Sequence, residues 1–179
     1  MKAVSFETIM SWKPCPDFPE ARIKRLMRGR KALSIADILN MQSITHSDKL
    51  WAVLRNDFFG DRKLRLIACD FAERVLPVFE AEHPDDNRPR KAIEVSRRYA
   101  IGEATDEELG SARSVARCAA WCAMCASRSA RCAAESAVSA ASCAAESAAW
   151  RAAESAGNDE RKAQIKIIKS YMEVDDENC

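Results

Sequence analysis

The sequence predicts an all-α protein: a compact bundle of short helices with a long Ala-rich helix, or an Ala-rich helical hairpin. Residues 111–156 are almost entirely Ala, Ser and Cys with sparse Arg, Glu and Trp, and Gly157 is the first Gly or Pro to interrupt them. Ala is the strongest helix former, whereas Gly and Pro break helices. The whole chain of 179 residues holds only five Gly and six Pro. Elsewhere apolar residues recur at helical spacing, which favours helices over many short strands.

The first 60 residues predict a series of short helices marked by capping residues and stops. Ser5, Ser34 and Ser47 have the side chains that serve as N-caps, and Pro19 suits a helix start with Gly29 just beyond its end. We expect these helices over residues 5–12, 19–27, 35–41 and 48–56.

Two stronger amphipathic helices follow. The first spans residues 61–82, where seven apolar residues recur at helical spacing and Pro77 is expected to kink the helix. The second runs to about Tyr99, is capped by Asp86 or Asn87, and ends at Gly102.

A capping box of Thr105 and Glu108 begins the Ala-rich segment. Projected at about 100° per residue, its charged residues, its Cys and Trp residues, and its alanines fall on three separate arcs. This phase holds from Arg113 to Trp150, so we expect one continuous helix of about 55 Å. A hairpin broken near Ser127–Ser129 is the alternative.

The remaining chain predicts a stop at Gly157, a last helix over about 160–172 and an acidic tail. We therefore expect three parts: a helical N-terminal domain (1–104), the Ala-rich long helix (105–156), and a C-terminal helix and tail packing back on the domain (157–179). The small alanine side chains allow another backbone to approach closely. The face that they form is longer than a small domain can cover. This predicts a homo-oligomer formed through the Ala-rich helix.

Composition and cysteine usage narrow the class of protein. The net charge is +1, the N-terminus lacks the apolar core of a secretory signal, and no run of about 20 apolar residues is present, so we expect a cytoplasmic protein with reduced thiols. Cys118, Cys122 and Cys125 have a C-x3-C-x2-C spacing used for iron–sulfur clusters. Their Ala-rich helical setting favours packing instead, so we expect no metal and no cofactor.

Six cations within ten residues form the candidate partner-binding site. A basic cluster can bind an acidic protein surface or the phosphates of nucleic acid, or simply form a solvated helix face. No set of aromatic residues lies among the cations, which weakens the nucleic-acid alternative. The six cations are Arg22, Lys24, Arg25, Arg28, Arg30 and Lys31.

No arrangement of residues typical of a catalytic site is present in the sequence, so we expect no enzyme activity.

Residues 69–113 resemble an immunity protein family with members in bacteria and tailed phages. The likeness lies in a Cys-containing helix, an Asp-x-Arg-Pro turn, a helix beginning Ala-Ile-Glu, and a following Ala repeat. The matching residues are Cys69, Glu73, Arg74, Pro84, Asp86, Arg88, Pro89, Ala92, Ile93, Glu94 and Gly102.

This resemblance implies a non-enzymatic inhibitor that binds a bacterial protein. It would be either an immunity protein that neutralises a toxin or a phage protein that antagonises a bacterial defence system. The alternative function is a nucleic-acid-associated phage factor that uses the basic segment 22–31. The first 60 residues are less typical of the family, so we expect them to determine partner specificity.

Overall fold

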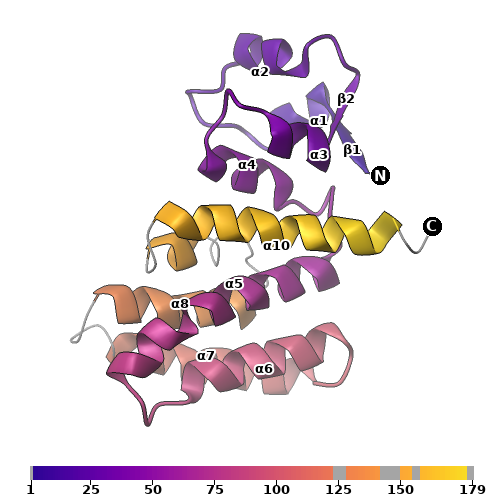
Figure 1. Ribbon diagram of the computed structural model, residues 1–179. Helices are drawn as coiled ribbons and strands as arrows, with labels where there is room; N and C mark the ends of the chain where they lie inside the picture. Colours follow the sequence, from indigo (N-terminus) through magenta and orange to yellow (C-terminus); the bar gives the residue numbers. More distant parts are fainter. Residues whose placement is uncertain (1, 123–127, 142–149, 155–157, 177–179) are drawn as a thin grey trace. The chain divides into compact units, whose positions relative to one another are not determined.

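The computed structural model describes residues 2–122, 128–141, 150–154 and 158–176 (Figure 1). Helices dominate these ranges, and their only sheet has two short strands, which confirms the all-α prediction. The chain forms two compact units, Met1–Phe58 and Phe59–Cys179, here called the N-terminal and C-terminal units. The expected boundaries of the three parts, after residues 104 and 156, stay a prediction.

The N-terminal unit combines short helices with a small antiparallel sheet. Strands β1 (Ala3–Ser5) and β2 (Ala32–Ser34) pair with Val4 opposite Leu33. Each strand runs directly into a helix through a serine N-cap: Ser5 accepts a hydrogen bond from the Thr8 N–H, and Ser34 accepts one from the Asp37 N–H. The helices of this unit are α1 (Phe6–Ser11), α2 (Glu20–Met27), α3 (Ile35–Asn40) and α4 (His46–Val53).

Two details of this unit differ from the sequence prediction. The strands were not expected, because three residues are too few to show an alternating pattern. The N-cap of α4 is Thr45 and not Ser47, since Thr45 and Asp48 form a reciprocal capping box. Asp48 stands three residues after Thr45, which is the spacing that a capping box requires.

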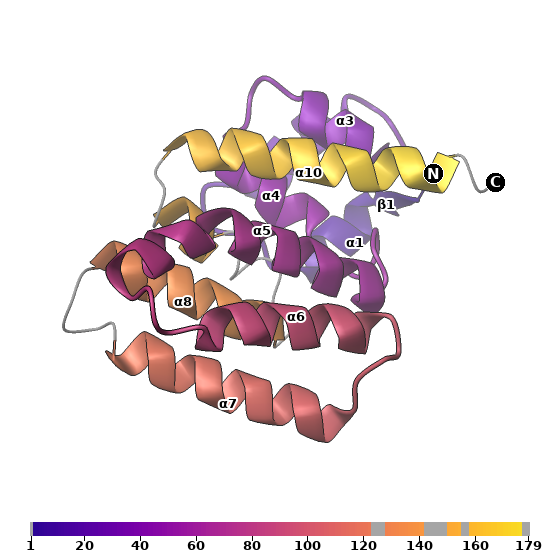
Figure 2. The ribbon, with the colours of Figure 1, turned by 60° about the horizontal axis from the view of Figure 1, so that its bottom comes forward.

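The C-terminal unit is a helical bundle. It contains α5 (Asp61–Glu82), α6 (Arg88–Ala100), α7 (Asp106–Cys122), α8 (Arg128–Ala141) and α10 (Asn158–Asp176), with residues 150–154 also helical. Figure 2 shows α6 and α7 side by side, with α8 beside α5. Because α8 contacts α5, α6 and α7, it is enclosed by three helices.

The prediction of one continuous Ala-rich helix is wrong. Helix α7 ends at Cys122, and α8 packs against it, so the chain reverses direction between them. The structure therefore matches the hairpin alternative, although most of the reversal lies outside the described residues. A second reversal follows α8, since Arg151 lies 3.2 Å from Glu135. In a straight helix these residues would stand about 24 Å apart.

The surface pattern predicted for the Ala-rich segment is confirmed on α7. Arg113 and Arg117 are exposed, whereas Ala116 and Ala119 are fully buried. On α8, Cys132, Ser136, Ala137 and Ala140 are among the fully buried residues. The small side chains thus allow close helix packing, as the sequence predicted, but they do so within one chain.

Polar contacts attach α10 to α5. The Arg74 guanidinium donates to both carboxylate oxygens of Glu160, and the Tyr171 hydroxyl donates to Asp70 at 2.8 Å. Asp70 also accepts a hydrogen bond from Arg97 of α6, so one carboxylate connects three helices. Burial, followed by the bond to Asp70, raises the pKa of the Tyr171 phenol, which keeps it a neutral donor. Ile168 adds a fully buried apolar contact.

Candidate partner-binding surface

The basic segment predicted from the sequence is built on α2 and the turn that leads to β2. Ile23 and Met27, one helical turn apart, are buried, so the cations of α2 lie on the outer part of the helix. Glu20 lies in the first turn, where a negative charge complements the helix dipole. The helix ends at Arg28, whose backbone is left-handed with φ of 49°.

Three of the six cations are engaged in contacts within the N-terminal unit. The Arg22 guanidinium lies 4.1 Å from the centre of the Phe18 ring and donates to the Asp17 carbonyl. Lys24 pairs with Glu20 at 2.5 Å and lies over the Phe6 ring. The third, Arg30, pairs with Asp37 at 2.7 Å. These three side chains are therefore engaged by their neighbours in the chain.

The other three cations, Arg25, Arg28 and Lys31, are exposed. Within the described part of the chain, their side chains form no hydrogen bond and no ion pair. The predicted group of six thus divides into a structural half and a half available to another molecule.

Arg30 is tied to the cap of the neighbouring helix. Asp37 accepts hydrogen bonds from the Ser34 backbone N–H at 3.0 Å and from the Ser34 hydroxyl at 2.7 Å. These two bonds, in that order, and then the charge of Arg30 lower the pKa of Asp37. The carboxylate is therefore charged at neutral pH and fixes both the start of α3 and the position of Arg30.

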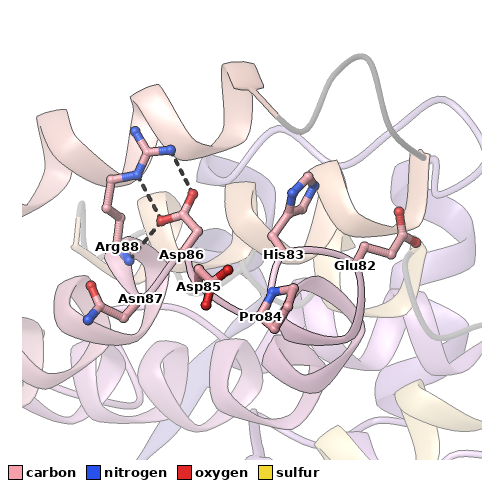
Figure 3. A pocket seen from close by; sticks show the side chains of 7 residues that line it. All are labelled: Glu82, His83, Pro84, Asp85, Asp86, Asn87 and Arg88. Atoms are coloured by element: carbon pink, nitrogen blue, oxygen red, sulfur yellow. Dashed lines mark hydrogen bonds and ion pairs between the residues drawn. The ribbon is translucent and has the colours of Figure 1, made fainter.

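The Asp-x-Arg-Pro turn of the family resemblance lines an open hollow of about 590 Å³ between α5 and α6 (Figure 3). Asp86 accepts hydrogen bonds from the backbone and the side chain of Arg88, and these side-chain bonds are the main reason that the pKa of Asp86 is lowered. The ring of His83 stacks near Phe79, with 4.9 Å between ring centres. One of the carboxylates that line the hollow, that of Asp86, is thus already engaged within the turn.

Other residues of the resemblance also hold helices together. The Cys69 thiol lies buried, 3.8 Å from the Ile93 carbonyl, so it joins α5 to α6. Glu73 pairs with Arg97 across the same two helices. Gly102 ends α6 with φ of 83°, a conformation that favours glycine. These positions encode packing, and a binding role for them has no support in their contacts.

The cysteine spacing falls partly outside the described residues. Cys118 is exposed on α7, whereas Cys125 and the side chain of Cys122 are not described. Cys132 is buried, and its desolvation raises the pKa of the thiol. Over the ranges that the structure covers, no three His, Cys, Asp or Glu side chains are grouped to hold a metal ion. In those same ranges, no helix combines the length and apolar character needed to cross a bilayer.

Comparison with known proteins identifies the family. Residues 61–153 match the family model described as "Imm-5 like putative immunity protein". The chain belongs to this family. No match to it was found among curated proteins or among solved structures.

The immunity family segment lies entirely within the C-terminal unit and covers α5, α6, α7 and α8. It contains the pairs Asp86–Arg88 and Glu73–Arg97, whereas Glu160 and Tyr171 of α10 lie beyond it. The N-terminal unit, with its basic segment, lies outside the match. The shared part of the family is thus a helical scaffold, and the candidate binding residues belong to the part that the family model does not cover.

Proposed function

We propose that this protein is a non-enzymatic inhibitor that binds a bacterial protein and neutralises it. The observation that carries the proposal is the match of residues 61–153 to an immunity protein family. The partner is a toxin, or a bacterial defence factor where the gene is carried by a phage. The site of action is the cytoplasm of the bacterial host cell.

The contacts of the C-terminal unit support a binding role. Several charged residues of the resemblance are paired within the unit, as Arg74 is with Glu160 and Asp86 with Arg88. An arrangement of mutually neutralised charges stabilises a scaffold and leaves these groups poorly suited to acid–base chemistry. A rigid scaffold suits inhibition by binding, because a preorganised surface loses little entropy when a complex forms.

The experiment is capture followed by reconstitution. The tagged chain is used to isolate a protein from lysate of the bacterium that encodes or hosts it, and the captured protein is then produced alone. Support requires a complex of defined stoichiometry and restored growth when the chain is co-expressed with a toxic partner. Stable binding to no protein, or binding without any change in the partner's activity, would contradict the proposal.

The alternative of a nucleic-acid-associated factor draws on the same basic segment. It predicts binding to duplex DNA with an affinity that falls steeply as salt rises. Tight binding to DNA with no protein partner would favour this alternative over inhibition.

Self-association through the Ala-rich helices stays a separate proposal. The sequence argument for self-association was an alanine face too long for the domain to cover. However, Ala116, Ala119, Ala137 and Ala140 are all buried within the chain. Light scattering of the purified protein at several concentrations distinguishes a monomer from a dimer. A mass of about 20 kDa throughout would contradict self-association.

A further inference from the structure

The exposed cations Arg25, Arg28 and Lys31 lie close together at one end of α2. Arg25 lies in the last turn of α2 and Arg28 is its C-cap, so their Cα atoms are at most about 11 Å apart. Lys31 follows three residues later, at most about 11 Å further along the chain. This separation is comparable to the screening length of about 8 Å at physiological salt, so an approaching acidic group interacts with more than one of them.

We propose that these three residues, here called the α2 basic end, form the docking surface for an acidic face of the inhibited protein. The inference takes from the proposed function the idea that the chain has a protein partner. It adds where the partner binds and what chemistry its surface has.

The backbone of Arg28 supports a role for its side chain. Arg28 is the C-cap of α2 and has a left-handed conformation, with φ of 49° and ψ of 41°. Glycine is usual at such a helix end, because any side chain destabilises this conformation. Gly29, the next residue, is also left-handed, with φ of 75°. The side chain of Arg28 is exposed in this strained conformation, where it is accessible to another molecule.

The charge of the two units supports an acidic partner. The N-terminal unit has ten Lys and Arg against six Asp and Glu, a net charge of +4, although the whole chain is nearly neutral. The C-terminal unit has eighteen against twenty-one, a net charge of −3. Long-range attraction of an acidic protein therefore favours the N-terminal unit, and such steering raises the association rate.

The structure argues against nucleic acid as the occupant. Proteins that bind duplex DNA through its phosphates commonly make about six to ten such contacts, and the α2 basic end offers three free cations. Proteins that bind single strands stack bases on aromatic rings. The nearby rings of Phe18 and Phe6 are already covered by Arg22 and Lys24. A small cluster of exposed cations better fits the rim of a protein interface.

The first test compares charge-reversed variants of the full chain. The test variant carries Arg25→Glu, Arg28→Glu and Lys31→Glu. The control reverses two arginines and one lysine that are exposed on the C-terminal unit, as Arg113→Glu, Arg117→Glu and Lys169→Glu. Binding of a fluorescein-labelled polyglutamate peptide and of a labelled DNA duplex is followed by anisotropy, after circular dichroism has verified that each variant is folded.

We expect the wild-type chain to bind the peptide at low ionic strength, the test variant to bind it at least about tenfold more weakly, and the control to retain most of the affinity. Equal loss in both variants, no loss in the test variant, no binding by the wild-type chain, or tighter binding of DNA than of peptide would each overturn the inference.

A second pair of variants separates binding from stability. Arg28→Gly removes one cation and the strain of its left-handed backbone, so we expect a higher melting temperature together with about threefold weaker peptide binding. Lys13→Gly is matched to it, because Lys13 also has a left-handed backbone, with φ of 54°, and lies outside the α2 basic end. The control should gain stability and keep its affinity. Unchanged binding in Arg28→Gly, or equal weakening in both variants, would contradict the inference.

The identified partner distinguishes this inference from the proposed function. If the wild-type chain neutralises its partner and the test variant does so equally well, the docking surface lies elsewhere and the inhibitory function stands. If the chain inhibits no protein, the proposed function fails whatever the peptide result.

Discussion

The ion pair between Arg74 and Glu160 provides a quantitative test of how α10 is held on the bundle. The side chain of Glu160 is only 4% exposed, and Arg74 donates to its two oxygens at 3.0 to 3.2 Å. Replacing Arg74 by Met keeps much of the aliphatic stem but leaves a carboxylate buried without its main partner. Breaking a fully buried pair costs about 3–5 kcal/mol, whereas exposed pairs contribute about 0–1 kcal/mol.

The expected loss of stability lies between these limits for two structural reasons. The Arg74 side chain is 45% exposed, so water already screens part of the interaction. Glu160 also lies in the first turn of α10, where the helix dipole stabilises a negative charge by about 0.3–1 kcal/mol. We therefore expect Arg74→Met to lower the free energy of unfolding by about 2 kcal/mol, which is a fall of about 4–8 °C in melting temperature.

The matched control is Arg90→Met. Arg90 also forms a two-bond pair with a glutamate, at 2.7 Å to each oxygen of Glu80, but the Glu80 side chain is 29% exposed. Loss of this more exposed ion pair should lower the free energy of unfolding by less than about 1 kcal/mol. Urea unfolding followed by circular dichroism gives both values, and hydrogen exchange of the α10 amides locates the effect. Equal losses for the two variants, or unchanged exchange in α10, would refute the argument that burial of Glu160 makes the difference.

Three further substitutions test local features of the fold. Asp37→Ala removes the carboxylate that caps α3 and should cost about 1 kcal/mol at pH 7. The pKa of Asp37 is lowered in the folded state, so its carboxylate stabilises the fold fully above the unfolded pKa of about 3.9. This stabilisation is lost as pH falls through the folded pKa. The free energy of unfolding, measured against pH in the acid range, should therefore change less in the variant than in the wild type. Gly102→Ala should cost about 1 kcal/mol through backbone strain alone, since an added Cβ would meet no atom within 4 Å; thermal melting that matches the wild type would contradict this. Ala119→Leu should cost about 1–3 kcal/mol by overpacking a fully buried position, whereas Ser114→Leu on the exposed side of α7 should change stability by less than about 0.5 kcal/mol in urea unfolding.

The features that the sequence predicted correctly are local ones, such as the ends of a helix and a capping box. Helix α5 begins at Asp61 and ends at Glu82, as its apolar spacing predicted. The Thr105–Glu108 capping box is present, with the Thr105 N–H donating to Glu108 and the Glu108 N–H donating to Thr105. These features depend on residues three or four positions apart, so the chain itself contains the information needed to predict them.

The Ala-rich segment shows where such local information ends. A face of alanines has the same periodicity in one long helix and in two helices joined by a short turn, so the unbroken phase did not distinguish them. The difference came from long-range contacts such as Arg151–Glu135. Arg151 pairs with Glu154 and also with Glu135. The pair with Glu135 joins two parts of the chain on either side of a reversal, so no helical spacing predicts it.

The candidate binding site was located from the sequence, but its division into paired and free cations was not. The Lys24–Glu20 pair has the four-residue spacing of a helix, so it could have been predicted. Arg30 and Asp37 are seven residues apart and lie on either side of β2, a strand that no sequence pattern revealed. Only the three-dimensional arrangement shows that Arg30 is occupied while Arg25, Arg28 and Lys31 are exposed.

The packing of α8 explains why this segment is so rich in alanine. Helix α8 contacts three other helices, and the small side chains at its buried positions allow these helices to approach closely. Larger side chains at the buried positions of α7 and α8 would push the neighbouring helices apart. Alanine therefore serves the interior of the scaffold, and its abundance does not by itself require a second copy of the chain. Other residue types form the exposed surface, and the proposed docking surface of the N-terminal unit lies outside the family match.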